Sequence, residues 1–459
     1  MHQTAMAWLF ARSIVGDEGR NAGIMMSLLG FVRGFSVTRA YHFGMKKLAN
    51  GHMPLAAAAL KRAAKGGHVG ACYEMARLYE MGRGVICDLE QARHLAQFAA
   101  DAGHVPSMAL AARLFLISPE RRAQTSGSAA SQLFCEPELA RHYALLAHSR
   151  GNVDGSALAG YLLASGIGGE VDAETAVVCY EPAVKVGHVR AFLGMGTLYA
   201  GGHLGEVDYA RALPYFKYAA AAGNNTARHY LALQFLKGLG TDVDEERALR
   251  LLSAAAAKGY RASIEELATY YLDETHPERD RQRGMRWLTA LGRMGDQKAC
   301  RELERRYRNG IDVPVNSIEA VTWLEKAALK GDVAAQFQMA VLAATGGGEA
   351  EPDYAQAKLW FEMASDNGHT IAMVNLGRFR MKGVGGDIDL DGARDILELA
   401  IECGEMAAFA VLGEFYAYYA EPADLDAARD ILLHGVERDD PVCRDLLSRL
   451  EDDLVAKVA

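Results

Sequence analysis

The sequence predicts an all-α protein, a right-handed α-solenoid of about eleven stacked antiparallel helix pairs, from three observations. First, a glycine that we call the marker glycine returns every 36 residues, apart from one interval of 48 and one of 37: Gly67, Gly103, Gly151, Gly187, Gly223, Gly259, Gly295, Gly331, Gly368 and Gly404. Second, the residue four positions after each marker glycine is small: Ala71, Ser107, Gly155, Ala191, Ala227, Ser263, Ala299, Ala335, Ala372 and Ala408. Third, larger apolar residues recur at helical spacing on two segments of each unit, which indicates two helices that approach closely at the small residues. Because such a pair cannot bury its apolar face alone, consecutive pairs are expected to stack.

A recurring phrase marks the turn between the two helices of a unit. It reads "LYEMGRGVICDLEQA" at 78–92 and "QFLKGLGTDVDEERA" at 234–248. Gly82 follows the first helix, where a left-handed cap favours glycine. Asp88 precedes the second helix as its expected N-cap, and the same position carries Asp172, Asp208, Asp244, Asp280 and Asp389 in other units. These residues are therefore assigned structural roles rather than a phosphate or metal site.

The period divides the chain into four segments. They are a helix or extension over 1–37, a short first helix pair over 38–66, the repeat solenoid over 67–439 and a capping helix over 440–459. Within the solenoid, residues 118–137 replace one inter-helix turn with a longer insertion, rich in Ser, Gly and Ala, which we expect to be exposed to solvent.

The apolar stretch "AGIMMSLLGFV" at 22–32 is too short to span a bilayer, which takes about 20 residues. Its arginines follow the apolar run, whereas a signal peptide carries its positive residues before it. We expect a helix that packs on the first repeat; a membrane-surface helix is the alternative, so membrane contact is expected only through 22–35. Because no other stretch is long and apolar enough to cross a membrane, a cytoplasmic location is expected.

Composition excludes several classes of function. A formal net charge of −9 and a pI near 5.9 argue against a nucleic-acid binder, which needs a surface that neutralises phosphates. The seven cysteines are scattered, without close pairs or a CxxC motif, so neither a disulfide framework nor zinc or redox chemistry is indicated. No cofactor and no metal are therefore expected.

Several stretches resemble the Sel-one-like repeat, a relative of the tetratricopeptide repeat. They include "MARLYEMGRGVICDLEQARHLAQFAADAG", "SIEAVTWLEKAALKG" and "AMVNLGRFRMKGVGGDIDLDGA", and the resemblance covers roughly residues 38 to 440. It implies a scaffold or adaptor that assembles partner proteins, with roles in bacterial signalling and in envelope or polysaccharide-secretion complexes. Some secreted relatives have been described as penicillin-binding proteins or β-lactamases and have a cysteine pair closing each repeat, which this chain lacks.

Catalytic signatures are absent from the sequence. It contains no GxSxG, HExxH, GxxxxGK[ST] or SxxK motif, so we predict that the protein is not an enzyme. The alternative is an enzyme or carbohydrate-binding subunit that uses the insertion at 118–137. Four histidines follow marker glycines, one per repeat and about 10 Å apart, too far to share a metal. We predict surface or loop positions for them: His68, His104, His188 and His369.

The candidate binding residues lie on first helices of the pairs, six, ten or thirteen positions after the marker glycine, except Arg380, which is twelve positions after Gly368. These positions fall off the core stripe, on the side that lines the concave face of stacked helix pairs. The residues expected to contact a partner are Tyr73, Arg77, Arg113, Tyr161, Arg301, Arg305, Arg308, Phe337, Arg378 and Arg380. Arginines and aromatic residues are enriched in protein-recognition hot spots. A basic strip in an acidic chain favours an acidic protein or peptide; alternatively, these arginines simply solvate a helix face.

Overall fold

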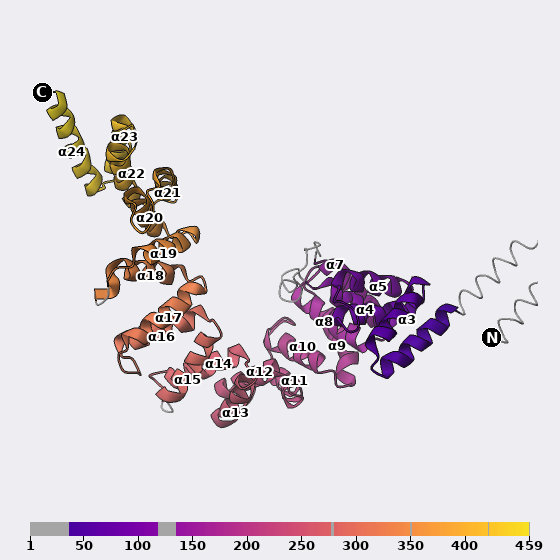
Figure 1. The fold of residues 1–459 in the computed structure, drawn as a ribbon. Helices are drawn as coiled ribbons and strands as arrows, with labels where there is room; N and C mark the ends of the chain where they lie inside the picture. The colour runs from indigo at the N-terminus through magenta and orange to yellow at the C-terminus, as the bar shows by residue number, and fades with distance from the viewer. Residues whose placement is uncertain (1–35, 118–134, 277–279, 349–350, 421, 459) are drawn as a thin grey trace, which may run out of the picture. The chain divides into compact units, whose positions relative to one another are not determined.

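The computed structural model describes residues 36–117, 135–276, 280–348, 351–420 and 422–458, and these residues form helices joined by turns, with no strand (Figure 1). Within these ranges the α-helices follow one another as eleven consecutive pairs and a final helix. The predicted all-α class and the antiparallel helix pairs are confirmed. The chain forms two compact units, Met1–Ala254 and Ala255–Ala459, and each is described separately. Residues 22–35 and most of the 118–137 insertion lie outside the described residues.

The first unit contains a helix over 36–49 and α3 (Met53–Lys65), followed by further pairs. These are α4 (Val69–Met81) with α5 (Leu89–Asp101), α6 (Val105–Phe115) with α7 (Pro137–Ser149), α8 (Val153–Ser165) with α9 (Ala173–Lys185), and α10 (Val189–Ala200) with α11 (Tyr209–Ala221). After these come α12 (Asn225–Lys237) and α13 (Glu245–Ala256). The boundary between the two units falls within α13.

The second unit continues the same order of helices. Its pairs are α14 (Arg261–Leu272) with α15 (Arg281–Arg293), α16 (Gln297–Asn309) with α17 (Ser317–Leu329), α18 (Val333–Thr345) with α19 (Tyr354–Asp366), α20 (Thr370–Lys382) with α21 (Leu390–Glu402), and α22 (Ala407–Tyr418) with α23 (Leu425–Val436). The last helix, α24 (Pro441–Val458), packs on α22 and α23. No helix among the described residues is long and apolar enough to cross a membrane.

The turn residues have the capping roles that the sequence predicts. Gly82 ends α4 in the left-handed region with a φ of 63°, and the Asp88 carboxylate accepts a hydrogen bond from the Gln91 N–H at 3.1 Å at the start of α5. A further glycine in the turn permits close approach between repeats. A Cβ on Gly168 would lie 2.1 Å from the carbonyl oxygen of Pro137, the first residue of α7. Neighbouring pairs can therefore pack closely only because the turn has no side chain there.

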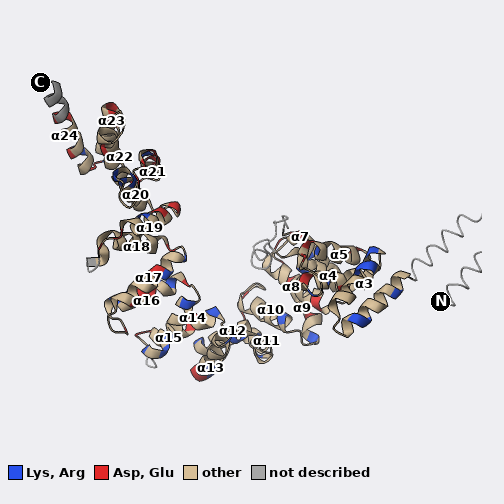
Figure 2. Cartoon of the chain, viewed as in Figure 1, with Lys and Arg blue, Asp and Glu red and all other residues tan. Residues whose placement is uncertain are grey.

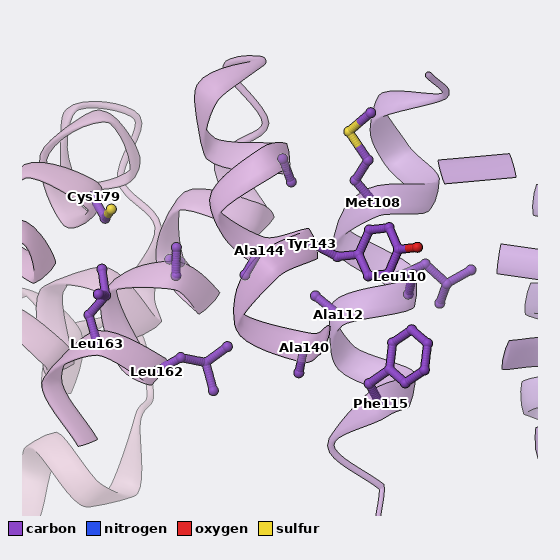
Figure 3. Packing of buried hydrophobic residues seen from close by; sticks show 14 of the residues in the cluster. Met108, Leu110, Ala112, Phe115, Ala140, Tyr143, Ala144, Leu162, Leu163 and Cys179 are labelled. Atoms are coloured by element: carbon purple, nitrogen blue, oxygen red, sulfur yellow. The ribbon is translucent and has the colours of Figure 1, made fainter. Parts of the chain in front are cut away.

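The core of the first unit consists of small residues at the helix contacts and larger side chains between them (Figure 3). Ala112, Ala140 and Ala144 are fully buried. The rings of Phe115 and Tyr143 stack with their centroids 5.7 Å apart, and they are drawn close together in Figure 3. Each fully buried large side chain contributes about 1.5–3 kcal/mol to stability, so the core is distributed along the array rather than concentrated at one point.

The histidines after the marker glycines lie in the loops between helix pairs, so the predicted surface or loop positions are confirmed. All four are N-cap residues of first helices and are half-buried. The Nδ1 atoms of His68 and His369 accept hydrogen bonds from the N–H groups of Ala71 and Ala372, each at 3.2 Å. Burial holds the pKa of both imidazoles below the ordinary value. Because each satisfies an otherwise unpaired N–H, His68 and His369 act as side-chain caps, whereas His104 and His188 make no capping hydrogen bond.

Candidate functional site

The first unit contains a hollow of about 890 Å³, which we call the unit-1 groove. It is lined mainly by the first helices of successive pairs, α4, α6, α8, α10 and α12. Its apolar surface comes from leucines and alanines of α6, α8 and α10. Three arginines, one aspartate and several tyrosines add polar groups. A mixed surface of this kind, with aromatic rings and guanidinium groups beside leucines, is suited to binding a peptide.

Four of the residues singled out in the sequence meet in this groove: Tyr73, Arg77, Arg113 and Tyr161. The Tyr161 ring projects from α8 with 51% of its surface exposed. The Tyr73 ring is half-buried and lies 5.0 Å from the His104 ring, between their centroids, so it also joins two repeats. Of the two aromatic residues, Tyr161 is therefore the one that offers most free surface to a ligand.

The two predicted arginines of the groove have carboxylate partners. Arg77 lies 3.3 Å from the Glu74 carboxylate on the same helix, and Arg113 on α6 lies 2.8 Å from Glu80 on α4. About half of each arginine side chain remains exposed, at 45% and 54%. Exposed ion pairs of this kind contribute only about 0–1 kcal/mol, so a ligand can displace or share these partners at small cost.

A tyrosine that the sequence analysis did not select forms part of the groove floor. Tyr180 lies on α9, a second helix, yet its side chain lines the groove while only 2% of the residue is exposed. Its ring lies against Gly160 of α8 and Gly194 of α10. A Cβ on Gly160 would be 2.7 Å from a ring carbon, and one on Gly194 would be 2.4 Å from the hydroxyl oxygen. The ring therefore passes between two first helices, and the hydroxyl reaches the groove.

Gly194 is unusual for its position in the repeat. Seven residues after the marker glycine, the other repeats carry a side chain: Glu74, Leu110, Leu158, Tyr230, Glu266, Glu302, Gln338, Asn375 and Val411. Tyr180 is unusual as well, since the equivalent residues of the next two repeats are Phe216 and Leu252. The combination of a glycine at 194 with a tyrosine at 180 was the sequence signal that could have identified Tyr180 as a groove residue. It was missed because the two residues lie on helices of neighbouring pairs, outside the positions six, ten and thirteen after the marker glycine.

The repeat family can be assigned at this point. The Sel1 repeat model matches eight stretches that together make up more than half of the chain: 69–104, 156–188, 191–224, 226–260, 262–296, 298–332, 333–369 and 370–405. This chain belongs to the Sel1 repeat family. Sel1 repeat arrays are generally protein-interaction scaffolds, and their fold is typically non-catalytic.

Solved structures of similar Sel1 repeat proteins come from several bacteria. A protective antigen of uropathogenic Escherichia coli with an SLR fold is 22% identical, with a TM-score of 0.49 over 92% of this chain and 89% of that chain. A Sel1 repeat protein from Oxalobacter formigenes is 22% identical, with a TM-score of 0.37 over 78% of this chain and 90% of its own. One from Klebsiella pneumoniae is 24% identical, with a TM-score of 0.31 over 46% and 96%. A comparison with curated proteins returned no match.

Six further candidate residues lie on α16, α18 and α20 of the second unit: Arg301, Arg305, Arg308, Phe337, Arg378 and Arg380. None of them lines the pocket of about 400 Å³ in that unit of the Sel1 array. Phe337 stacks on the ring of His369, with centroids 4.3 Å apart. Arg378 is exposed, whereas Arg380 is half-buried and donates a hydrogen bond to the Gly392 carbonyl at 3.1 Å. Whether these residues contact a partner stays a prediction.

The arginines of α16 do not form a row of unpaired cations. Arg305 donates two hydrogen bonds to Glu302, at 2.7 and 2.9 Å, and Arg308 lies 3.0 Å from Glu304. Figure 2 shows basic and acidic residues together on the helices of the second unit. Arg301 donates to the Gln338 amide oxygen on α18 at 2.6 Å. Glutamates on the same helix face thus offset part of the positive charge that the spacing of the arginines predicts.

Metal chemistry has no evident location in the described part of the Sel1 array. There, no group of three His, Cys, Asp or Glu side chains is arranged to hold an ion. All seven cysteines lie in the described ranges and are free thiols, and burial raises the pKa of Cys179 to about 11 and that of Cys443 to about 12. Such thiols remain protonated at neutral pH and are poor nucleophiles.

Proposed function

We propose that this Sel1 array is a non-catalytic scaffold or adaptor that holds a partner protein or peptide along the concave side of its first helices, with the unit-1 groove as the main site. The observation that carries the proposal is the convergence of five first helices on one groove. Tyr161 and Tyr230 expose 51% and 39% of their surfaces. Large, partly exposed rings beside leucines contribute much contact area at low entropic cost, as protein-binding hot spots require.

The partner that we propose is acidic. Of the three arginines that line the groove, Arg77 and Arg113 are paired with Glu74 and Glu80, whereas Arg190 makes no ion pair with a described residue, although the chain as a whole carries a net charge of −9. An acidic segment would therefore be attracted to this groove and repelled by most of the remaining surface. The same net charge disfavours nucleic acid as the partner.

The proposed setting follows from the family and from the cysteines. An assembly role in bacterial signalling, or in an envelope or polysaccharide-secretion complex, is of the kind that the family resemblance implies. We propose a cytoplasmic location because seven free thiols are compatible with a reducing compartment. The six candidate residues of the second unit are proposed as additional contacts for a longer partner.

A random peptide library displayed on phage tests the groove directly. Peptides selected on the full chain are expected to bind the Tyr161→Ala variant about tenfold more weakly, because a hot-spot tyrosine is removed. Tyr418→Ala is the matched control, since this tyrosine of α22 is 56% exposed and lies in the second unit. Selected peptides that bind the wild type and Tyr161→Ala equally well would contradict the proposed site.

A further inference from the structure

Three polar groups of the unit-1 groove are notable because they make no hydrogen bond with a described residue: the Tyr180 hydroxyl, the Arg190 guanidinium and the buried Nδ1 atom of His188. The Tyr180 hydroxyl makes no hydrogen bond with a described residue; the residue is only 2% exposed, but its oxygen is not one of the fully buried unpaired atoms and opens into the groove. Arg190 on α10 also lines the groove, is exposed, and makes no ion pair with any described residue. A hydroxyl that opens into the groove and an unpaired guanidinium beside it are both free to bind a polar atom of a ligand.

The helix geometry places the Tyr180 hydroxyl and Arg190 close together. Arg190 and Gly194 are four residues apart on α10, so their side-chain positions lie on one face, about 5–6 Å apart. Gly194 has no side chain, and the Tyr180 hydroxyl oxygen occupies nearly the same space, 2.4 Å from where a Cβ would be. The Tyr180 hydroxyl therefore occupies the space where a side chain at position 194, four residues after Arg190, would lie.

From this arrangement we infer that Tyr180 and Arg190 form a subsite for one carboxylate side chain of an extended acidic peptide. The inference rests on the groove function proposed above and names the chemical group that is recognised. The guanidinium donates to the carboxylate, and the hydroxyl donates to one of its two oxygens. Leu193 and Leu158 provide apolar contacts for the flanking residues of the peptide.

A single negative charge fits this subsite better than a phosphate group. Asp154 is 81% exposed at the groove and lies 3.3 Å from the His188 ring, so another carboxylate is already present at the N-terminal end of α10. One unpaired guanidinium can balance one carboxylate, whereas a dianion would be repelled by Asp154 with less compensation.

The test uses synthetic copies of the library peptides that depend on Tyr161. Each acidic residue of a peptide is changed to its amide, Glu→Gln or Asp→Asn, and affinities are measured for the wild type, Tyr180→Phe and Arg190→Gln. At one acidic position of the peptide, we expect the change to the amide to weaken binding to the wild type about tenfold. The same change should have little effect on binding to Arg190→Gln, because the guanidinium that the carboxylate contacts is already missing. Tyr180→Phe should weaken the same carboxylate-dependent binding several-fold. Phenylalanine fits this position, since Phe216 occupies the equivalent place in the next repeat.

Two control variants remove the same groups outside the groove. Tyr143→Phe deletes a buried hydroxyl that donates to Asp101 at 2.6 Å, and Arg211→Gln deletes an exposed guanidinium on α11. Both should leave peptide affinity unchanged. Three outcomes would overturn the subsite while the groove function stands. The selected peptides could lack acidic residues, their binding could require phosphoserine, or the losses of affinity from the amide change and from Arg190→Gln could simply add. A library in which no peptide depends on Tyr161 would contradict both.

Discussion

At the scale of single residues, the pair Tyr180 and Gly194 shows how one missing side chain changes a repeat. In the next repeat the equivalent residues are Phe216 and Tyr230, whose rings stack with their centroids 5.3 Å apart. There, the side chain at the Gly194-equivalent position covers the aromatic ring. Gly194 has no side chain to cover the Tyr180 ring, so a tyrosine of the second helix, although buried, contributes to the groove as well as to the core.

Filling this gap should destabilise the protein. A Cβ in Gly194→Ala would lie 2.3 Å from the Tyr180 Cζ atom, which forces the ring to move. Overpacking of this kind costs about 1–3 kcal/mol in the free energy of unfolding, measured by denaturant titration. Adding Tyr180→Leu should recover much of the loss, because Leu252 occupies the equivalent position two repeats later. If Gly194→Ala unfolds at the same denaturant concentration as the parent, the ring does not lie where we describe it.

At the scale of helices, the first turn of each first helix depends on its N-cap. The marker glycine places the next residue at the cap, and asparagine, aspartate and histidine all serve there. Asn152 and Asn224 accept from N–H groups at 2.7 and 2.9 Å, as His68 and His369 do at 3.2 Å. Only the histidines titrate near neutral pH, so they make helix capping sensitive to pH.

We predict that stability falls when the pH is lowered below about 6.5 because these two caps are lost. Their folded-state pKa is lowered from 6.5, mainly by burial. Between the lowered pKa and 6.5, the unfolded chain binds more protons than the folded one. The stabilisation is therefore complete above the unfolded pKa and is lost as the pH falls through the folded pKa.

Melting temperatures of the double variant His68→Asn, His369→Asn check this prediction. Between about pH 7.5 and pH 5.5 the variant should lose less stability than the wild type, because asparagine caps without titrating. His434→Asn is the control, since this exposed histidine on α23 is not a cap. An equal loss in the wild type and the double variant would assign the pH dependence to other groups.

At the scale of the molecule, charge is distributed unevenly between the chain and its groove. The net charge is −9, while the unit-1 groove contains Arg190, a guanidinium without an ion pair to a described residue, beside two arginines that are paired with glutamates. Partner recognition should therefore depend on long-range attraction to the groove as well as on short-range contact with its tyrosines.

Raising the salt concentration from about 0.05 M to about 0.5 M should slow the association of an acidic groove-binding peptide, because added ions shorten the distance over which opposite charges attract each other. The dissociation rate should change much less. Stopped-flow fluorescence measures both rates, and the amide version of the same peptide is the control, since it should associate with little salt dependence. Association rates that are independent of salt would rule out electrostatic attraction of the partner.

Periodic signals made most of the fold predictable. The marker glycines, the small residue four positions later and the capping aspartates each depend on local backbone conformation or on a contact that recurs in every repeat. A requirement repeated ten times leaves a pattern that one sequence displays. Four groove residues, Tyr73, Arg77, Arg113 and Tyr161, followed from the same register.

Features that occur in only one repeat could not be predicted from the periodic pattern of the sequence. Tyr180 reaches the groove only because two glycines on neighbouring helices leave room for its ring. A gap that occurs in a single repeat leaves no periodic pattern in the sequence. The arginines of α16 looked like a basic strip until their pairing with Glu302 and Glu304 was visible. The sequence establishes the repeat because local and periodic constraints act along the chain. Which side chains remain unpaired at the surface depends on packing between helices, where a partner from another segment can cover a ring or neutralise a charge.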